Sequence, residues 1–173
     1  GVVAAMLRIR ELEDHARRSR FAPVDLAKIA ADACELHRPI AEDRGIDLVC
    51  TIAPVPPFDG DDSLLIEALS NLIDNAMKFG PANGRVAVDL RRDGHHAVLS
   101  VTDDGAGVPV SDRLLVTQRF YRGSHEVDGV GLGLSLVKAI ADLHGCTLAF
   151  ASDRSCVSLV FALDPDTDKR LRH

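Results

Sequence analysis

The chain has 173 residues, which predicts one domain with a short appendage and a core that forms without disulfide or metal staples. Hydrophobic residues make up 46% and charged residues 27%, a balance that argues against wholesale disorder. The formal net charge of -6 disfavours general nucleic-acid binding, because phosphate contacts need a basic surface. Any anion must therefore be bound by local geometry.

The four cysteines, Cys34, Cys50, Cys146 and Cys156, are scattered along the chain and form no CxxC pair. This spacing indicates no zinc site and demands no disulfide framework, so a reduced, cytoplasmic setting fits best. The chain also has no run of about 18 apolar residues and no signal-peptide pattern. We therefore expect a cytoplasmic domain, with an inner-membrane anchor elsewhere in a full-length protein left open.

The first part of the chain predicts two helices with a short extended segment between them. Residues 2–18 are apolar early and highly charged late, as in a helix cut at its start, which indicates a fragment of a longer protein. In FAPV, residues 21–24, Pro23 pushes the residue before it into extended backbone. Asp25 then fits as the N-cap of a helix that Pro39 should kink or end and that stops no later than Gly45.

The rest of the chain predicts strands and helices with one long loop. We expect a strand at 46–52, a helix at 62–79 capped by Asp61, a turn at 80–84, a hairpin of strands 85–90 and 97–103, a helix at 133–144, a closing hairpin of strands 147–152 and 158–164, and a mobile polar tail. Residues 104–131 have five glycines and no sustained periodicity, and loops that long are usually functional or disordered. Hairpins dominate, so the predicted fold is an α/β two-layer sandwich whose mixed, largely antiparallel sheet is covered on one face by helices.

A polar face on the predicted helix 62–79 is the first candidate site. Asn71, Asn75 and Lys78 are spaced at i, i+4 and i+7, which places them on one face beside the buried stripe. An asparagine carbonyl oxygen is a hard, neutral ligand suited to Mg²⁺, and a nearby lysine can meet a phosphate. Taken alone, the pattern more often marks a solvated helix face.

The second candidate is DDGAG, residues 103–107, directly after a predicted strand. There Asp103 would accept a hydrogen bond from an exocyclic amine such as the adenine amino group, and Gly105 and Gly107 would let a flat ring approach closely. Asp-Gly is also common turn chemistry, so a simple turn is the more frequent meaning of this pattern by itself.

The third candidate is GVGLGLSLVKAIADLHG, residues 129–145, in which bare glycine backbone leads into a helix. Amides at a helix N-terminus favour anions, so a phosphate, a dinucleotide or only a hinge would suit the stretch. A dinucleotide fold needs an apolar strand before the glycines and GxGxxG spacing, whereas the third glycine here falls one residue early. A P-loop is excluded, because the chain contains no GxxxxGK[ST].

Together, in this order and at these intervals, the motifs resemble the catalytic, ATP-binding domain of bacterial two-component sensor histidine kinases, within the GHKL ATPase superfamily. LSNLIDNAMKF resembles the N box of that family, DDGAG its G1 box, RFYRG its F box and GVGLGLSLVKAIADLHG its G2 box. The resemblance implies an ATP-binding catalytic domain of the Bergerat type at residues 21–163. It also implies the end of a second dimerisation helix and its linker at 1–20, with a flexible tail at 164–173.

By this resemblance, the chain would bind ATP and Mg²⁺ between a lid and the helices that cover the sheet. Asn75 would be the metal ligand, Asn71 would border the metal and phosphates, and Lys78 would meet phosphate oxygens; these three form the expected catalytic set. Asp103 would read the adenine amino group. The expected nucleotide site comprises Asn71, Asn75, Lys78, Phe79, Asp103, Gly105, Gly107, Val108, Tyr121, Arg122, Gly129, Val130, Gly131, Leu132, Gly133 and Leu134.

The resemblance implies transfer of the γ-phosphate to a histidine on a dimerisation domain, with a response regulator as a further partner. None of the seven histidines stands in the family's H-E/D-x-x-T/N-P pattern, so we expect the phosphoacceptor outside this chain rather than at His15 or His125. Relatives that hydrolyse ATP carry a glutamate where Asn71 stands, and an amide cannot take a proton, so we expect very slow ATPase turnover. The full-length protein is expected to be a homodimer, a monomer being open for this fragment.

Departures from the family pattern keep alternative functions open. Thr117 stands where the F box starts with an aromatic residue, and Cys146 and Cys156 stand at or near places of family glycines. These changes leave room for a nucleotide-binding regulatory module without transfer activity. An anti-sigma-type serine kinase has the same fold, but the GVGLGLSLV helix and the dimerisation-like first helix favour the histidine-kinase branch, and Asn71 disfavours a GHKL hydrolase.

Overall fold

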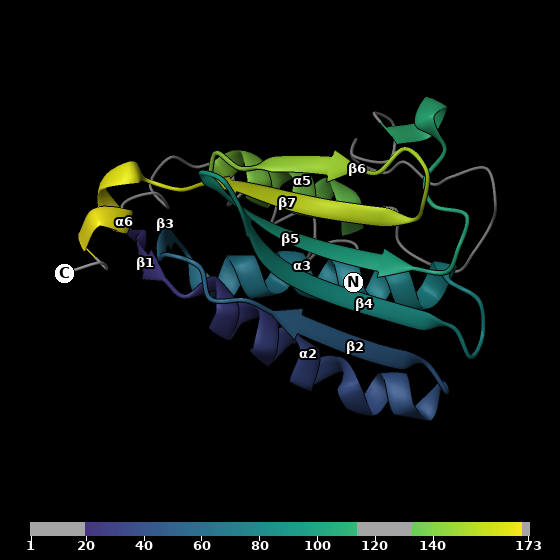
Figure 1. Ribbon diagram of the computed structural model, residues 1–173. Coiled ribbons are helices and arrows are strands. Elements are labelled where there is room, and N and C mark those ends of the chain that lie inside the picture. The colour runs from purple at the N-terminus through teal and green to yellow at the C-terminus, as the bar shows by residue number, and fades with distance from the viewer. Residues whose placement is uncertain (1–19, 114–132, 171–173) are drawn as a thin grey trace.

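The computed structural model describes residues 20–113 and 133–170, and its central element is a five-stranded sheet (Figure 1). The strand order is β2 (Asp47–Ile52), β4 (Arg85–Asp93), β5 (His96–Asp103), β7 (Cys156–Ala162) and β6 (Thr147–Phe150). The β2–β4 pair is parallel and the other three pairs are antiparallel. The predicted mixed, largely antiparallel sheet is therefore confirmed, as are both predicted hairpins.

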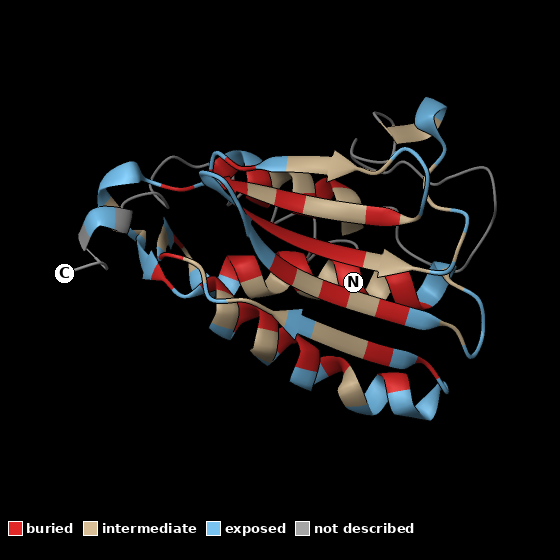
Figure 2. Cartoon of the chain, in the orientation of Figure 1, coloured by how far each residue is buried: buried red, intermediate tan, exposed pale blue. Residues whose placement is uncertain are grey.

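Three helices cover one face of this sheet, as predicted (Figure 1). They are α2 (Leu26–Asp43), α3 (Asp62–Phe79) and α5 (Gly133–Leu143), and α3 packs between the other two. Burial alternates along the first part of β4, whereas the central strand β5 is buried continuously from Ala97 to Val101 (Figure 2). The largest buried side chains of this core are Leu26, Leu64, Leu65, Leu69, Ile73, Leu90, Leu99, Ile140, Leu159 and Phe161.

Both predicted helix caps are present and explain where α2 and α3 begin. The Asp25 carboxylate accepts hydrogen bonds from the backbone N–H groups of Ala27 and Lys28, at 3.0 and 3.3 Å. The Asp61 carboxylate accepts one from the backbone N–H of Leu64 at 3.1 Å. Each aspartate satisfies N–H groups that have no partner within the helix, so each fixes the first turn.

Pro39 lies inside α2 and does not end it, although the helix stops before Gly45 as predicted. The helix continues to Asp43, and the backbone N–H of Arg44 still bonds to Ile40 and Ala41 carbonyl oxygens at 3.2 Å. The turn after the proline is held because Ala41 is buried against the core, at 1% exposure. Packing of this apolar face outweighs the hydrogen bond that proline cannot make.

Three short elements were not predicted from the sequence: a strand, a helix and a 3₁₀ turn. Between the expected strand at 46–52 and the expected helix at 62–79 lies β3 (Phe58–Gly60), which pairs antiparallel with β1 (Ala22–Val24), the segment expected to be extended. The tail contains α6 (Pro165–Arg170), where proline occupies the first helical position that suits its fixed φ. A single 3₁₀ turn, Val110–Asp112, lies after the G1-box motif. The predicted helix at 2–18 lies outside the described residues.

The expectation of reduced cysteines is wrong for one pair. Cys34 on α2 and Cys50 on β2 form a disulfide, although 16 residues separate them. They meet because α2 leads directly into β2 and packs against it, a tertiary relationship that cysteine spacing does not reveal. Cys146 and Cys156 are free and buried. None of the helices in the described ranges has the length and apolar character of a membrane span.

Candidate functional site

Helix α3 carries the predicted polar face at the border between core and solvent. Asn71 and Asn75 are half-buried, whereas Lys78, in the last turn, is exposed. The positions between them, including Leu72 and Ala76, are buried under the sheet. The face thus lies beside the apolar stripe, as its spacing predicts, and its two amides are held at fixed places by the packing of the helix.

The two amides differ in what they bond. The Asn71 side-chain nitrogen donates to the backbone oxygen of Glu67 at 2.9 Å, so its carbonyl oxygen is turned away from its own helix. The Asn75 amide makes no hydrogen bond to any described residue. Among the described residues, nothing occupies the side-chain oxygen of either asparagine, so both oxygens are available to a ligand.

The N-terminus of α5 lies against these amides. A Cβ atom on Gly133, its first residue, would be 3.3 Å from both polar atoms of the Asn75 amide and 3.8 Å from the Asn71 oxygen. The N–H groups at the start of a helix carry partial positive charge and favour anions. The start of the G2-box helix therefore lies beside the N-box amides, and a nucleotide-binding role for Gly133 stays a prediction.

Asp103, at the end of β5, is held by two hydrogen bonds from opposite sides. Its Oδ1 accepts from the backbone N–H of Gly105 at 2.6 Å, and its Oδ2 accepts from the hydroxyl of Ser155 at 2.8 Å. Each carboxylate oxygen has a further lone pair, so the group retains capacity to accept a hydrogen bond from a ligand.

The G1-box loop comes close to the end of α3, the helix that carries the two amides. A Cβ on Gly105 would lie 2.7 Å from Asp103 Oδ1 and 3.0 Å from the backbone oxygen of Phe79, so only glycine fits there. Gly107 has φ +77°, a left-handed conformation that glycine adopts without strain. Phe79 itself is 56% exposed at the mouth of this region.

Two residues that the sequence did not single out support this loop. Ser155 holds Asp103, and Arg113 donates from Nε to the backbone oxygen of Val108 at 3.2 Å and from its terminal nitrogen to that of Ala151 at 2.7 Å. The Arg113 guanidinium also lies over the Phe150 ring, 5.6 Å from its centroid. No spacing in the sequence connects these positions: the pairing of β5 with β7 places Ser155 beside Asp103, and side-chain contacts join Arg113 to the turn after β6.

The remaining predicted residues fall into two groups. Leu134, the second residue of α5, is half-buried and packs against the core. The predicted lid residues Tyr121, Arg122, Gly129, Val130, Gly131 and Leu132 lie outside the described residues, as do Thr117, His15 and His125. Their assignments remain predictions.

The donor set suits a metal ion that takes few protein ligands. Within residues 20–113 and 133–170, no cluster of three or more His, Cys, Asp or Glu side chains could hold a metal. Mg²⁺ usually keeps several waters and binds through one or two protein oxygens together with phosphate groups. An unpaired Asn75 amide beside a helix N-terminus fits that mode, and a closed transition-metal site does not.

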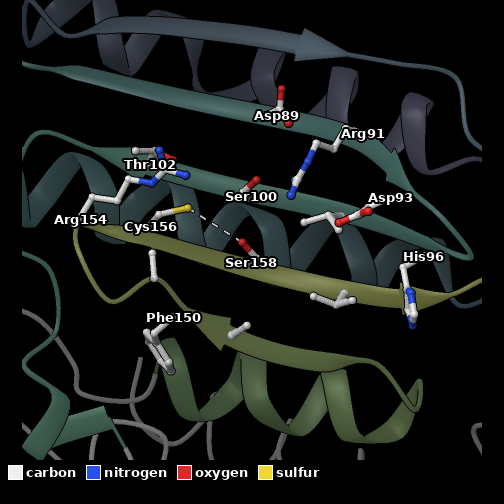
Figure 3. Close-up of a pocket in the computed structure, with 14 residues that line it drawn as sticks. Asp89, Arg91, Asp93, His96, Ser100, Thr102, Phe150, Arg154, Cys156 and Ser158 are labelled. Atoms are coloured by element: carbon white, nitrogen blue, oxygen red, sulfur yellow. Dashed lines mark hydrogen bonds between the residues drawn. The ribbon is translucent and has the colours of Figure 1, made fainter.

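A separate hollow of about 670 Å³ lies on the open face of the sheet (Figure 3). Side chains of mixed charge line it, among them Asp89, Arg91 and Arg154, with hydroxyl groups such as that of Ser158. None of the predicted site residues within 20–113 and 133–170 lines this hollow, because these residues lie at the end of β5, in the loop after it and on the helix layer. The site above is therefore not the hollow on the sheet.

The family model for histidine kinase-, DNA gyrase B- and HSP90-like ATPases matches residues 60–165, which include α3, the G1-box loop and α5. The chain belongs to this ATPase family. The motif resemblance to sensor histidine kinases is confirmed by relatives of that kind.

Two relatives illustrate the match within the ATPase family. The chain is 32% identical over 151 residues to the sensor-like histidine kinase SenX3 of Mycobacterium tuberculosis, covering 85% of this chain and 37% of SenX3. It is 38% identical over 126 residues to the signal transduction histidine-protein kinase/phosphatase MprB of Mycobacterium avium, covering 71% of this chain and 24% of MprB. The chain thus spans well under half of these proteins.

Solved structures agree with this assignment at the level of the ATPase domain. A mycobacterial MprB structure has a TM-score of 0.69 at 34% identity, covering 82% of this chain and 97% of that one. The ATP-binding domain of PrrB from Mycobacterium tuberculosis has a TM-score of 0.64 at 28% identity, covering 83% and 96%. Full-length ShkA in complex with AMPPNP has a TM-score of 0.78 at 28% identity, covering 94% and 36%. The chain is accordingly a histidine-kinase-type catalytic ATPase domain.

Proposed function

We propose that this domain binds Mg-ATP and transfers the γ-phosphate to a histidine on a phosphoacceptor domain, in two-component signal transduction. The observation that carries the proposal is the approach of Gly133, at the start of α5, to the amides of Asn71 and Asn75. It combines neutral oxygen ligands with a helix N-terminus, which is what a metal-bound triphosphate requires.

The proposal assigns a role to each residue on the polar face of α3. Asn75 holds Mg²⁺ through its amide oxygen, Asn71 borders the metal and the phosphates, and Lys78 meets a phosphate oxygen as a point charge. When bound, the metal ion neutralises charge on the phosphate oxygens. The chain's own contribution is to hold the phosphates in line with an incoming nucleophile, because phosphoryl transfer depends mainly on positioning and electrostatics.

The base side of the site selects the nucleotide in this proposal. Asp103 accepts a hydrogen bond from the adenine amino group, since both of its oxygens are already oriented by donors from the chain. Gly105 and Gly107 keep the backbone bare where the ring lies. The base stacks in the region bordered by Phe79 and Val108, and residues 121–122 and 129–132 supply the lid over the phosphates.

The amide of Asn71 favours transfer of the γ-phosphate to a protein side chain over hydrolysis of ATP. Its side chain offers an amide where a general base would need a carboxylate, so no group at that position takes a proton from water. The acceptor histidine belongs to a dimerisation domain of the same protein, and a response regulator takes the phosphoryl group next. We propose a homodimeric full-length protein that presents this domain in the cytoplasm.

Calorimetric titration with ATP, with and without Mg²⁺, tests the proposal on the 173-residue chain. Asn75→Ala should abolish the tighter binding that Mg²⁺ confers and leave metal-free binding nearly unchanged. Asp103→Ala should weaken binding at least tenfold in both conditions, since it removes a charged hydrogen-bond acceptor for the base. Asp89→Ala, on the open face of the sheet, is the matched control and should change neither.

Full ATP affinity in both site variants would contradict the site assignment. Transfer itself is tested by mixing the chain with the phosphoacceptor domain of the full-length protein and measuring acid-labile, alkali-stable phosphate. An acid-stable phosphoserine product would favour the serine-kinase alternative, and binding without any transfer would favour the regulatory module.

A further inference from the structure

The turn between β6 and β7 reaches the carboxylate that the proposed function assigns to the base. Ser155 is the last residue before β7, and its hydroxyl donates to Asp103 Oδ2 at 2.8 Å across 52 residues of sequence. Its backbone oxygen accepts a hydrogen bond from the Asp103 N–H at 3.0 Å. The two residues are therefore joined twice, once through the backbone and once through the side chains.

The Asp103 carboxylate depends on both of its partners for a single orientation. The last torsion of an aspartate side chain is broad, so a carboxylate with one partner can rotate. Here the Gly105 N–H binds Oδ1 at 2.6 Å and the Ser155 hydroxyl binds Oδ2 at 2.8 Å, from two different segments. Donors on both oxygens fix the plane of the group and the direction of its remaining lone pairs.

Ser155 is itself held in place by the turn that carries it. The backbone N–H of Ala151 bonds to the oxygen of Cys156 at 3.0 Å, and Arg113 donates to the oxygen of Ala151 at 2.7 Å. The G1-box loop packs on the turn from the other side, since a Cβ on Gly107 would lie 3.1 Å from Ser155 Cα. The hydroxyl thus acts from a rigid support, which a pre-organised binding group needs.

We propose that Ser155 is a positioning residue for nucleotide recognition: its hydroxyl fixes the Asp103 carboxylate to accept the exocyclic amino group of adenine, and it thereby sets the preference for a 6-amino purine. This inference rests on the proposed function, in which Asp103 meets the base. Ser155 acts through Asp103 and does not itself touch the base. Its effect is therefore confined to ligands whose exocyclic amino group donates to Asp103.

The test compares ATP with purine riboside triphosphate, which lacks the 6-amino group, on the whole 173-residue chain by calorimetry with Mg²⁺. Ser155→Ala should weaken ATP binding about tenfold and leave the affinity for purine riboside triphosphate within about twofold, because one oriented hydrogen bond is lost. Ser155→Thr keeps the hydroxyl and should retain most of the preference. Ser152→Ala, an exposed serine of the same turn, is the matched control and should change neither affinity.

Equal losses for both nucleotides, or no loss for either, would overturn the role of Ser155. If Ser155→Ala does not fold, Ser155→Cys replaces it, since a thiol is a weak donor of similar size, and the same selective loss of ATP binding is expected. Asp103→Asn is measured in parallel: full ATP binding by that variant would refute the base site of the proposed function. Impaired ATP binding in Asp103→Asn together with an unchanged Ser155→Ala would refute only this inference.

Discussion

Gly133 faces the side chain of Asn75 so closely that a Cβ atom on the glycine would lie 3.3 Å from both polar atoms of the amide. This contact joins α5 to α3 at the point where the metal-bound phosphates are proposed to lie. At 3.3 Å a Cβ is tighter than an ordinary contact, so a side chain at Gly133 would push the Asn75 amide away by at least a few tenths of an ångström.

Gly133→Val should displace the Asn75 amide and weaken Mg-ATP binding about tenfold, with little effect on metal-free binding. Calorimetry with and without Mg²⁺ measures the difference. A double-mutant cycle with Asn75→Ala separates this effect from a general disturbance of α5, because Gly133→Val should add almost nothing once the amide is gone. Additive losses would mean that Gly133 acts on the nucleotide by another route.

Asn71 should determine how slowly the domain hydrolyses ATP. Asn71→Glu places a carboxylate on the same face of α3, and we expect steady-state phosphate release to rise about tenfold or more, since a base within reach of water then exists. Asn71→Gln is the matched control, because the glutamine side chain is as long as that of glutamate but its amide cannot take a proton. Rapid hydrolysis by the unchanged chain would contradict the role given to this amide.

A buried histidine links α2 to α3. His37 is 3% exposed; its Nδ1 lies 2.8 Å from the Ala33 oxygen and its Nε2 lies 3.2 Å from the Asp74 carboxylate. Both ring nitrogens face acceptors, and only the protonated ring donates to both. The hydrogen bond to Asp74 raises the pKa of His37 above its ordinary value of 6.5, although burial opposes the rise.

The raised pKa of His37 predicts the direction of a pH effect. A group whose pKa is higher in the folded state stabilises the fold fully below the unfolded-state pKa of 6.5 and loses that contribution as the pH rises through the folded-state pKa. Urea unfolding across this range should show a fall of about 1 kcal/mol in the free energy of unfolding, relative to Asp74→Asn. Asp32→Asn, which breaks the exposed pair with Lys28, is the control and should keep the fall. Identical pH profiles for wild type and Asp74→Asn would refute the ion pair.

Local signals in the sequence predicted what local physics determines. Asp25 and Asp61 cap helices as their positions indicate, and the spacing of Asn71 and Asn75 gave their common face. One alternative failed where tertiary contacts decide: α2 does not end at Pro39, because its buried face continues beyond the proline. The three-residue strands β1 and β3 are too short to show a periodicity, and each forms by pairing with the other.

At the candidate site, too, some residues are found from local sequence patterns and others only from tertiary contacts. Asp103 is recognisable because its motif is contiguous, whereas Ser155 approaches it only through the pairing of β5 with β7. A single serine at a strand start has no distinguishing pattern, so its role emerges only when the partner atoms are placed. The same holds for Cys34 and Cys50, whose pairing depends on the packing of α2 beside β2.

The Cys34–Cys50 disulfide closes a short loop between α2 and the edge strand β2. Cross-linking residues about 15 apart stabilises a protein by about 3 kcal/mol in the chain-entropy model, because it restricts the unfolded chain. Reduction should therefore lower the free energy of unfolding by about that amount, as measured by urea titration with and without dithiothreitol. Cys50→Ala should show the same lower stability in both conditions, since it has no bond to lose.

Thiol counting tests the bond independently of stability. Unfolded in denaturant without reductant, the chain should label at two cysteines, Cys146 and Cys156, and after reduction at all four. In the folded state Cys146 should react slowly near neutral pH, because burial raises the pKa of its thiol to about 12 and the thiolate is the reactive form. Labelling at four cysteines in denaturant before reduction would show that Cys34 and Cys50 are free, and reduction would then leave the stability unchanged.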